Sequence, residues 1–345
     1  MSDSLRERWI DWSPSLSLDE RLQRWGRETS SSSRYVTDEP LSRHSSLRIG
    51  GMADHWIEVG TLDDLWALLA ALGDSDCYPV GLGSNTLFPD EGIEEPVIRL
   101  VDELASFTVQ PESDGRACTA HVMAGAINAH LVRGLLGDGW VGAEFLILIP
   151  GTFGGAVALN AGTKEKELKA ILDSVWLAIR DDEAEQWRVE RRTAQSLAMR
   201  YRHTKLPPQA MVVSGSLHLE TGDVEAARER VQQDKKRRNR TQPYRLASVG
   251  STFANPVGDF AGRLIEQVGL KGKSIGGAAI SSLHANFFIN QSDATAEDFL
   301  RLMALARHRV RCDFDIDLRP EVRFVGFDGR ARMRELEREL EDKNV

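Results

Sequence analysis

Cysteine is scarce in this sequence: the 345 residues include three, Cys77, Cys118 and Cys312. No two of them have CxxC spacing, and an odd, scattered set builds neither a disulfide framework nor a zinc site. We therefore expect buried, reduced thiols and a cytoplasmic location. The eight histidines form no HxxxH or HExxH motif, so the sequence predicts no metal site.

Long hydrophobic stretches and an excess of positive charge are also missing. No segment approaches the ~18 consecutive apolar residues of a membrane-spanning helix, and the opening segment lacks the apolar core of a signal peptide. The net charge of -9 argues against nucleic acid or an anionic membrane as the main partner. Any bound phosphate must therefore be held by a local basic cluster or by backbone amides.

The length of 345 residues predicts two or three packed units. Residues 1–34 end in a serine run and predict a poorly ordered extension with a short helix near Leu18 to Trp25. Strands and helices then alternate, which favours an α+β or α/β domain over residues 35–222. A second unit is expected over 223–330, followed by a solvated, charged tail at 331–345.

Capping residues and hydrophobic periodicity predict the individual elements. Helices are expected at about 61–73, 127–136, 223–240, 261–268 and 295–309. Strands are expected at about 78–82, 119–124, 285–290 and 321–325.

The segment from Ile149 to Gly162 is the most informative part of the chain because it has so little side-chain bulk. Its small residues are Gly151, Gly154, Gly155, Ala156, Ala158, Ala161 and Gly162. Small residues let a backbone come within hydrogen-bonding distance of a ligand, and consecutive amides can bind an anion. Such a wall suits a flat ring and a pyrophosphate together; the alternative is a turn followed by a tightly packed helix.

A second glycine-containing turn, Gly81-Leu82-Gly83-Ser84-Asn85, follows a predicted strand, as a phosphate-binding turn does. Thr86 stands where the Rossmann motif has its third glycine, so this is not a Rossmann fingerprint. Alone, the turn is more simply a β-turn. Two such loops in one domain favour a dinucleotide held without a Rossmann fold.

Two basic features could bind anions in this acidic protein. Arg202 precedes a pair of prolines and can hold a substrate carboxylate through a bidentate fork, although an isolated arginine is more often a surface ion pair. The run Lys235 to Arg240 is a basic island that suits a diphosphate. The alternative for this run is the solvated face of a charged helix.

Ser251 and Glu321 are candidates for proton donation. Ser251 follows a glycine in a strand-like stretch without a GxSxG elbow, so an activated nucleophile is a poor interpretation, whereas a proton donor is possible. Glu321 opens an apolar strand, where a carboxyl group near a cleft can have a raised pKa and act as an acid. Taken singly, a structural hydroxyl and a capping or ion-paired carboxylate are the simpler interpretations.

Together these segments resemble the UDP-N-acetylenolpyruvoylglucosamine reductases (UDP-N-acetylmuramate dehydrogenases, the MurB family), in their compact subfamily. The resemblance runs from about Leu47 to Gly326, and the order and spacing of its motifs make it specific. The motifs are Ile49 to Asp54, Gly81 to Asn85 with Asp90 to Gly92, Ile149 to Gly162, Tyr201-Arg202, Gly250-Ser251, Ala261 to Gln267, Gly269 to Gly272, Gly276-Gly277, His284-Ala285 and Glu321-Val322.

The resemblance implies an α+β fold: a two-lobed FAD-binding domain of the PCMH (vanillyl-alcohol-oxidase) type, then a smaller α/β substrate-binding domain, with the flavin in the cleft between them. It implies that the following residues bind FAD: Gly81, Leu82, Gly83, Ser84, Asn85, Thr86, Ile149, Pro150, Gly151, Thr152, Gly154, Gly155, Ala156, Asn160, Ala161, Gly162 and Arg238. It implies that the substrate contacts Tyr201, Lys205, Arg240, Asn255 and His284.

The resemblance also implies the reaction. NADPH would reduce the FAD, which would pass hydride to the enolpyruvyl group of UDP-N-acetylglucosamine enolpyruvate, giving UDP-N-acetylmuramate for peptidoglycan synthesis. Arg202 would stabilise the charge that develops on the substrate carboxylate, Ser251 would deliver a proton, and Glu321 would assist as an acid. A monomer without nucleic-acid or membrane partners is expected.

The sequence leaves several points open. Leu82 stands where the family often has glycine, and Thr241 where some members have a phosphate-binding lysine, so Arg240 or Lys205 is the candidate for that charge. A flavin oxidase of an alcohol or sugar on the same fold remains an alternative. So does a catalytically silent protein that binds a sugar nucleotide.

Overall fold

A computed structural model describes residues 16–181 and 186–342 and divides the chain into two compact units. Unit 1 comprises the residues up to Thr37, His55–Gly81 and Glu95–Asp234, and unit 2 comprises Asp38–Asp54, Leu82–Glu94 and the residues from Lys235 onward. The units are therefore interleaved, whereas the sequence predicted one boundary near residue 222. Composition does not change at the crossing points, so it could not indicate them.

Unit 1 contains most of the strands. They are β1 (Arg34–Val36), β4 (Trp56–Val59), β5 (Tyr78–Val80), β7 (Val97–Leu100), β8 (Phe107–Pro111), β9 (Ala117–Met123), β10 (Trp140–Val141), β11 (Leu172–Asp181), β12 (Gln186–Thr193) and β13 (Met211–Thr221). Its helices are α2 (Leu18–Glu28), α3 (Leu62–Leu72), α4 (Asn128–Gly137) and α5 (Phe153–Leu159), and α6 (Val224–Thr241) contains the boundary to unit 2.

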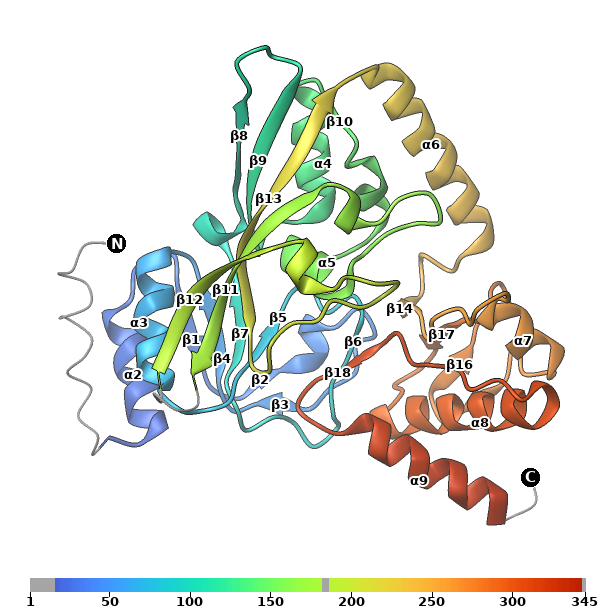
Figure 1. The fold of residues 1–345 in the computed structure, drawn as a ribbon. Helices are drawn as coiled ribbons and strands as arrows, with labels where there is room; N and C mark the ends of the chain where they lie inside the picture. Colours follow the sequence, from blue (N-terminus) through green and yellow to red (C-terminus); the bar gives the residue numbers. More distant parts are fainter. Residues whose placement is uncertain (1–15, 182–185, 343–345) are drawn as a thin grey trace. The chain divides into compact units, whose positions relative to one another are not determined.

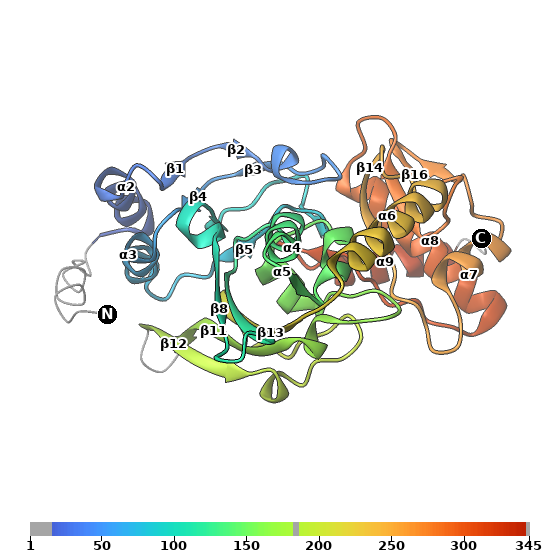
Figure 2. The same ribbon diagram turned by 90° about the horizontal axis from the view of Figure 1, so that it is seen from above.

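Two sheets build unit 1 (Figures 1 and 2). In the order β1-β4-β7-β5, the last three strands are parallel, because α3 carries the chain back between β4 and β5. Thr61 caps α3 and Gly73, with a φ of +57°, ends it, as the sequence predicts. The larger sheet, β12-β11-β13-β9-β8 with β10 on β13, is antiparallel throughout.

Residues 1–15 of the predicted extension lie outside the described residues, whereas the serine-rich segment from residue 16 to β1 is ordered, unlike the extension that the sequence predicts. The predicted short helix is present as α2, which begins with a capping box between Ser17 and Glu20. Its Trp25 is fully buried and donates a hydrogen bond from Nε1 to the Asp64 carbonyl at 3.0 Å. The Asp64 carboxylate accepts hydrogen bonds from the hydroxyls of Ser30 and Ser33, which ties this segment to α3.

Unit 2 has smaller sheets and longer helices. Its strands are β2 (Glu39–Pro40), β3 (Met52–Ala53), β6 (Thr86–Leu87), β14 (Ala247–Ser251), β15 (Ser274–Ile275), β16 (Ala278–Ile280), β17 (Phe287–Asn290) and β18 (Arg323–Phe324). Its helices besides the end of α6 are α7 (Ala261–Gln267), α8 (Ala296–Phe314) and α9 (Gly329–Asp342). Strands β14-β17-β16-β15 form an antiparallel sheet, which gives unit 2 an α+β architecture like that of unit 1.

The early segments of unit 2 are bonded to its late ones. Strand β6 pairs in parallel with β18. The Asn290 side chain donates to the Leu47 carbonyl at 2.9 Å, and the Asp90 carboxylate accepts from the amides of Ala296 and Glu297 at the start of α8. These long-range bonds are the physical reason why 38–54 and 82–94 belong to unit 2.

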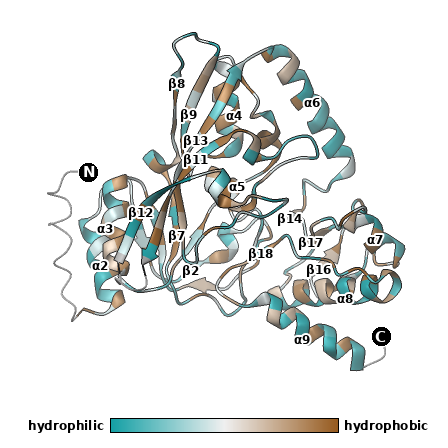
Figure 3. Ribbon diagram, viewed as in Figure 1, coloured by the Kyte–Doolittle hydropathy of each residue, from teal (hydrophilic) through white to brown (hydrophobic). Residues whose placement is uncertain are grey.

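The C-terminal tail also differs from the prediction. Instead of a solvated segment, the described part forms α9, which buries Met333, Leu336 and Glu337 against unit 2. Figure 3 shows the alternation of polar and apolar colour along α9 that such packing requires. Because most residues of this segment are charged, the sequence analysis did not identify its apolar face.

Two further expectations are corrected by burial and length. All three cysteines are free thiols, but Cys312 is exposed, whereas Cys77 and Cys118 are buried as expected. The predicted strands near 78–82 and 321–325 are shorter, at β5 and β18, and the last predicted helix extends five residues further, to Phe314.

Within the described residues, no helix is long and apolar enough to cross a membrane.

Candidate active site

The predicted site residues divide between the two units, and the geometry of each group is described by itself. Unit 1 contains Gly81, Ile149 to Gly162, Tyr201, Arg202 and Lys205. Unit 2 contains Leu82 to Thr86, Arg238, Arg240, Ser251, Asn255, His284 and Glu321. The first glycine turn therefore crosses from one unit to the other between Gly81 and Leu82.

In unit 1 the glycine-rich segment Ile149 to Gly162 contains α5. Thr152 caps the helix, and Asn160 ends it in the left-handed conformation with a φ of +43°. The amides of Phe153 and Gly154 donate to the carbonyls of Ala126 and Ala124, each at 2.8 Å. The segment is thus fixed by its backbone rather than by large side chains.

Asn128, at the start of α4, holds the entry to this segment, and sequence reasoning missed it. Its amide donates to the Gly151 carbonyl and its side chain to the Ile149 carbonyl, both at 3.1 Å. The residue is almost completely buried. A polar side chain at the first position of a predicted apolar helix was the available signal.

The two predicted glycine loops meet within unit 1. A Cβ on Gly81 would lie 2.6 Å from Thr152 Oγ1. The backbone after β5 therefore lies so close to the cap of α5 that any side chain at position 81 would clash. Gly154 and Gly162 are likewise closely packed, against Ala124 and the Lys166 carbonyl. Gly155 differs: it is exposed, and a Cβ there would meet Thr152 Oγ1 at an ordinary 3.7 Å.

Arg202 lies at the end of the same segment. It sits in a tight turn closed by a bridge between Arg200 and His203 and has a φ of +53°, which is uncommon for a residue other than glycine. Its Nη2 donates to the Gly162 carbonyl at 3.0 Å, and its Cζ lies 4.9 Å from the centre of the Tyr201 ring. The structure therefore brings Tyr201 and Arg202 to the glycine-rich segment, whereas the Lys205 side chain is exposed.

In unit 2 the turn from Leu82 to Thr86 is held by its own backbone. The Gly83 carbonyl accepts from the Ser46 amide at 3.1 Å, and Gly83 has a φ of +60°. A Cβ on Gly83 would lie 1.9 Å from the His44 carbonyl oxygen, so no other residue fits without a shift of the backbone. Thr86 pairs with Arg323 in the β6–β18 pair.

Ser251 and Glu321 lie on neighbouring segments of unit 2. Ser251 ends β14, and the next residue, Thr252, accepts a hydrogen bond from the Glu321 amide at 2.9 Å through its carbonyl. The Asn85 side chain donates to the Glu321 carbonyl at 2.9 Å. Asn85 and the two segments that carry Ser251 and Glu321 are thus bonded to one another, although they are far apart in the sequence.

A buried asparagine that the sequence analysis passed over fixes this arrangement. Asn286 Nδ2 donates to the Phe253 carbonyl at 2.8 Å, and its Oδ1 accepts from the Phe253 amide at 3.0 Å. The Asn286 side chain thereby makes the two hydrogen bonds to Phe253 that a neighbouring strand would otherwise make. Its place directly after the predicted His284-Ala285 motif was the signal that could have found it.

The remaining predicted residues of unit 2 lie near the ends of helices. The Asn255 side chain accepts a hydrogen bond from the Ala261 amide at 3.0 Å and so supports the start of α7, although Asn255 is exposed. Arg238 donates to the Tyr244 hydroxyl at 3.2 Å, and Arg240 is exposed. The roles of these residues in binding remain predictions.

His284 is half-buried beside the Phe287 ring, at 4.9 Å between ring centres. Its Nδ1 accepts the Asn286 amide at 3.2 Å. Burial lowers the pKa of His284 below the ordinary histidine value, and the charge of Lys271 acts in the same direction. The ring is therefore neutral at pH 7 and available for hydrogen bonding.

This lowered pKa predicts a stability that depends on pH. Below the pKa of an unfolded histidine, ~6.5, the unfolded chain binds a proton that the folded ring resists, so stability falls as the pH decreases toward the folded value. In urea unfolding between pH 5 and 7.5, His284→Gln should show a smaller loss of stability toward low pH than the wild type. The exposed His130→Gln, which retains His284, should lose as much stability as the wild type does.

Comparisons with known proteins agree on one family. Residues 242–325 match a family model described as "UDP-N-acetylenolpyruvoylglucosamine reductase, C-terminal domain". The UDP-N-acetylenolpyruvoylglucosamine reductase of Methylococcus capsulatus is 41% identical over 293 residues, which cover 85% of this chain and 93% of that protein. An Anaeromyxobacter protein of the same name is 42% identical over 293 residues, covering 84% of this chain and 88% of that protein.

A solved structure extends the similarity to the fold. The UDP-N-acetylenolpyruvylglucosamine reductase of Thermus caldophilus aligns with a TM-score of 0.69 and 32% identity, covering 85% of this chain and 98% of that one. The fold and these similarities place the chain among the oxidoreductase enzymes of α+β architecture, as the sequence predicts. More particularly, the chain belongs to the family of UDP-N-acetylenolpyruvoylglucosamine reductases.

Proposed function

We propose that this protein binds FAD and uses the hydride of NADPH to reduce UDP-N-acetylglucosamine enolpyruvate to UDP-N-acetylmuramate, for peptidoglycan precursor synthesis. The names of the relatives support the substrate, since those proteins are reductases of UDP-N-acetylenolpyruvoylglucosamine. We further propose that the protein works as a monomer in the cytoplasm.

The glycine-rich segment of unit 1 supports the choice of FAD. Gly155 is exposed, and a Cβ there would meet Thr152 Oγ1 only at an ordinary 3.7 Å, so a flat ring can approach the backbone there. Gly81 and Thr152 hold the two glycine loops against each other. These observations support a flavin at this segment, and we propose that the predicted residues from Ile149 to Gly162 line it.

The chemistry requires one hydride and one proton. FAD, when bound, would supply the redox chemistry, the transfer of a hydride from NADPH to the methylene carbon of the enolpyruvyl group. The carbon–carbon double bond becomes single, NADP⁺ is released, and the adjacent carbon must gain a proton. Ser251 donates this proton, Arg202 binds the carboxylate on which negative charge develops, and Glu321 assists as an acid.

One observation supports this assignment most strongly: the hydrogen bond from the Glu321 amide to the carbonyl of Thr252, the residue after Ser251. It joins the two predicted proton donors, which lie seventy positions apart in the sequence, through one pair of backbone segments. Neither a capping glutamate nor a structural serine would need the other as a neighbour.

The proposal is tested by a visible spectrum of the purified protein. We expect a yellow protein whose flavin band is bleached by NADPH without oxygen and restored by one equivalent of the enolpyruvyl substrate. NADH, as a control, should bleach the band more slowly. Restoration by oxygen but not by the substrate would indicate an oxidase, and a colourless protein that takes up no FAD would indicate a silent sugar-nucleotide-binding protein.

A further inference from the structure

The segment between α8 and β18, residues 315–322, carries Glu321 but contains no helix or strand. Its second half is held by the backbone of the segment after Ser251: the Ala254 amide donates to the Arg319 carbonyl, and the Glu321 amide to the Thr252 carbonyl, each at 2.9 Å. Its first half has no such strand partner among the bonds described. The Arg307 side chain of α8 holds it instead, and Glu337 of α9 in turn holds Arg307.

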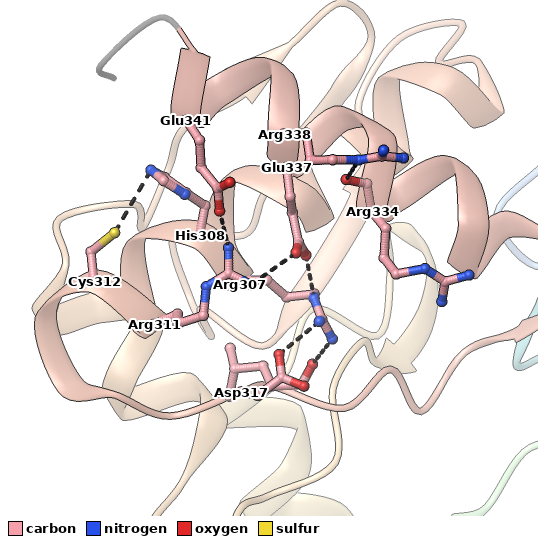
Figure 4. A network of polar contacts seen from close by, with 10 residues as sticks. Arg307, His308, Arg311, Cys312, Asp317, Arg334, Glu337, Arg338 and Glu341 are labelled. Atoms are coloured by element: carbon pink, nitrogen blue, oxygen red, sulfur yellow. Dashed lines mark hydrogen bonds and ion pairs between the residues drawn. The ribbon is translucent and has the colours of Figure 1, made fainter.

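Arg307 supplies the first of these contacts from the buried side of α8. Its Nη1 donates to the Leu318 carbonyl at 2.5 Å, and its Nη2 lies 2.6 Å from Asp317 Oδ1 (Figure 4). Arg307 is 9% exposed, and Leu318 is fully buried. Because α8 is a long helix packed in the core of unit 2, its Arg307 holds the segment in place at Leu318, three residues before Glu321.

Glu337 of α9 holds the guanidinium in this orientation. Its Oε1 accepts a hydrogen bond from Arg307 Nε, and its Oε2 accepts one from Arg311 Nη1 at 3.2 Å (Figure 4). Glu337 is 4% exposed, so both charges of the Arg307–Glu337 pair are buried. A buried charge left without its partner is strongly unfavourable. Without Glu337 we expect the Arg307 guanidinium to turn toward solvent and release the Leu318 carbonyl.

Attachment of α9 to α8 does not by itself require an ion pair. Met333 and Leu336 already bury apolar surface in the core of unit 2. Apolar residues of similar volume often replace a buried ion pair without loss of stability. An apolar pair could not donate a hydrogen bond to the Leu318 carbonyl, and this is the contact that requires a guanidinium.

We propose that Arg307 and Glu337 are positioning residues for Glu321, acting through the Leu318 carbonyl and the Asp317 carboxylate. The inference rests on the proposed function, in which Glu321 assists proton donation. Helix α9 begins at Gly329, after the family-model match ends at residue 325. The C-terminal helix thus contributes to the site from outside the matched segment.

The test uses the double variant Arg307→Met/Glu337→Met, which removes both charges and keeps the core filled. Glu341→Gln is the matched control, because Glu341 lies on the same helix and pairs with Arg311 instead of Arg307. Three quantities are measured on the flavin-loaded full chain: the rate of flavin reduction by NADPH, the rate of reoxidation by the substrate, and the hydrogen exchange of the Glu321 and Val322 amides.

We expect the double variant to fold, with a modest loss of stability because the Leu318 carbonyl loses its hydrogen bond, and to reduce its flavin at the wild-type rate. Reoxidation by the substrate should be about tenfold to a hundredfold slower, with unchanged substrate affinity, because a small misplacement of a reacting group is costly. The Glu321 and Val322 amides should exchange faster. The control should match the wild type in all three measurements.

Unchanged reoxidation, with or without faster exchange, would overturn the proposal, as would an equal loss in both half-reactions. If the wild type itself shows no reoxidation by the substrate, the proposed function fails. Amide exchange then decides alone whether the pair positions the segment, and unchanged exchange would refute this. Should the double variant not fold, the same measurements on Arg307→Lys decide, since lysine lacks the fork that reaches Leu318 and Glu337 together.

Discussion

Ser251→Ala is expected to slow reoxidation of the reduced flavin by the enolpyruvyl substrate by about 10²- to 10⁴-fold, the usual contribution of a general acid. Ser251 ends β14, where it pairs with Phe287, and the following residue is bonded to Glu321. Alanine leaves the strand backbone unchanged and removes only the hydroxyl. Stopped-flow absorbance of the flavin, without oxygen, measures the rate.

The other half-reaction provides the control for this variant. Reduction of the flavin by NADPH needs no proton from Ser251, so its rate should stay within about twofold of the wild type. Ser248→Ala, in the same strand, should change neither half-reaction. An equal loss in both half-reactions would show that Ser251 supports the fold or the flavin rather than proton transfer.

Arg202→Met is expected to lower the rate of reoxidation by the substrate by about 10²- to 10³-fold, because one group that stabilises a developing anion contributes on that scale. The Arg202 guanidinium is bonded to the Gly162 carbonyl and lies beside the Tyr201 ring. Arg202→Lys should recover part of the rate, since it restores the charge but not the bidentate fork. Stopped-flow absorbance again separates the two half-reactions.

Arg200→Met is the matched control for Arg202. Arg200 lies in the same turn, and its described bonds are made by its backbone. Its carbonyl accepts a hydrogen bond from the Asn160 side chain at 3.1 Å, and its bridge with His203 closes the turn. This variant should keep wild-type rates. If Arg202→Met retained the rate of the wild type, or if Arg200→Met lost as much, the assignment of the carboxylate-binding role to Arg202 would be wrong.

Local elements were predictable because their signals are local. Thr61 and Gly73 delimit α3 in the sequence as they do in the structure, and α2 follows from its capping residues and the spacing of Leu22 and Trp25. The division into units was not predictable. It depends on pairs such as β6 with β18, which form across more than two hundred residues and leave no trace in composition.

The site was predictable in part for a related reason. Glycines that accept a close neighbour, such as Gly81 against Thr152, are visible in a sequence as an unusual density of small residues. The residues that hold the site are ordinary by comparison. Asn128, Asn286 and Glu337 are single polar side chains whose role comes from burial, and burial is set by tertiary packing.

The interleaved units have a consequence for how the chain matures during synthesis. The apolar side chains of Leu47, Ile49 and Leu87 belong to the core of unit 2, yet the rest of that core begins at Val249, about 160 to 200 residues later in the chain. At a typical translation speed they wait on the order of ten seconds for their partners. During that interval these apolar side chains lack the partners that bury them in the folded unit, so we expect the unfinished chain to be more prone to aggregation than the complete one.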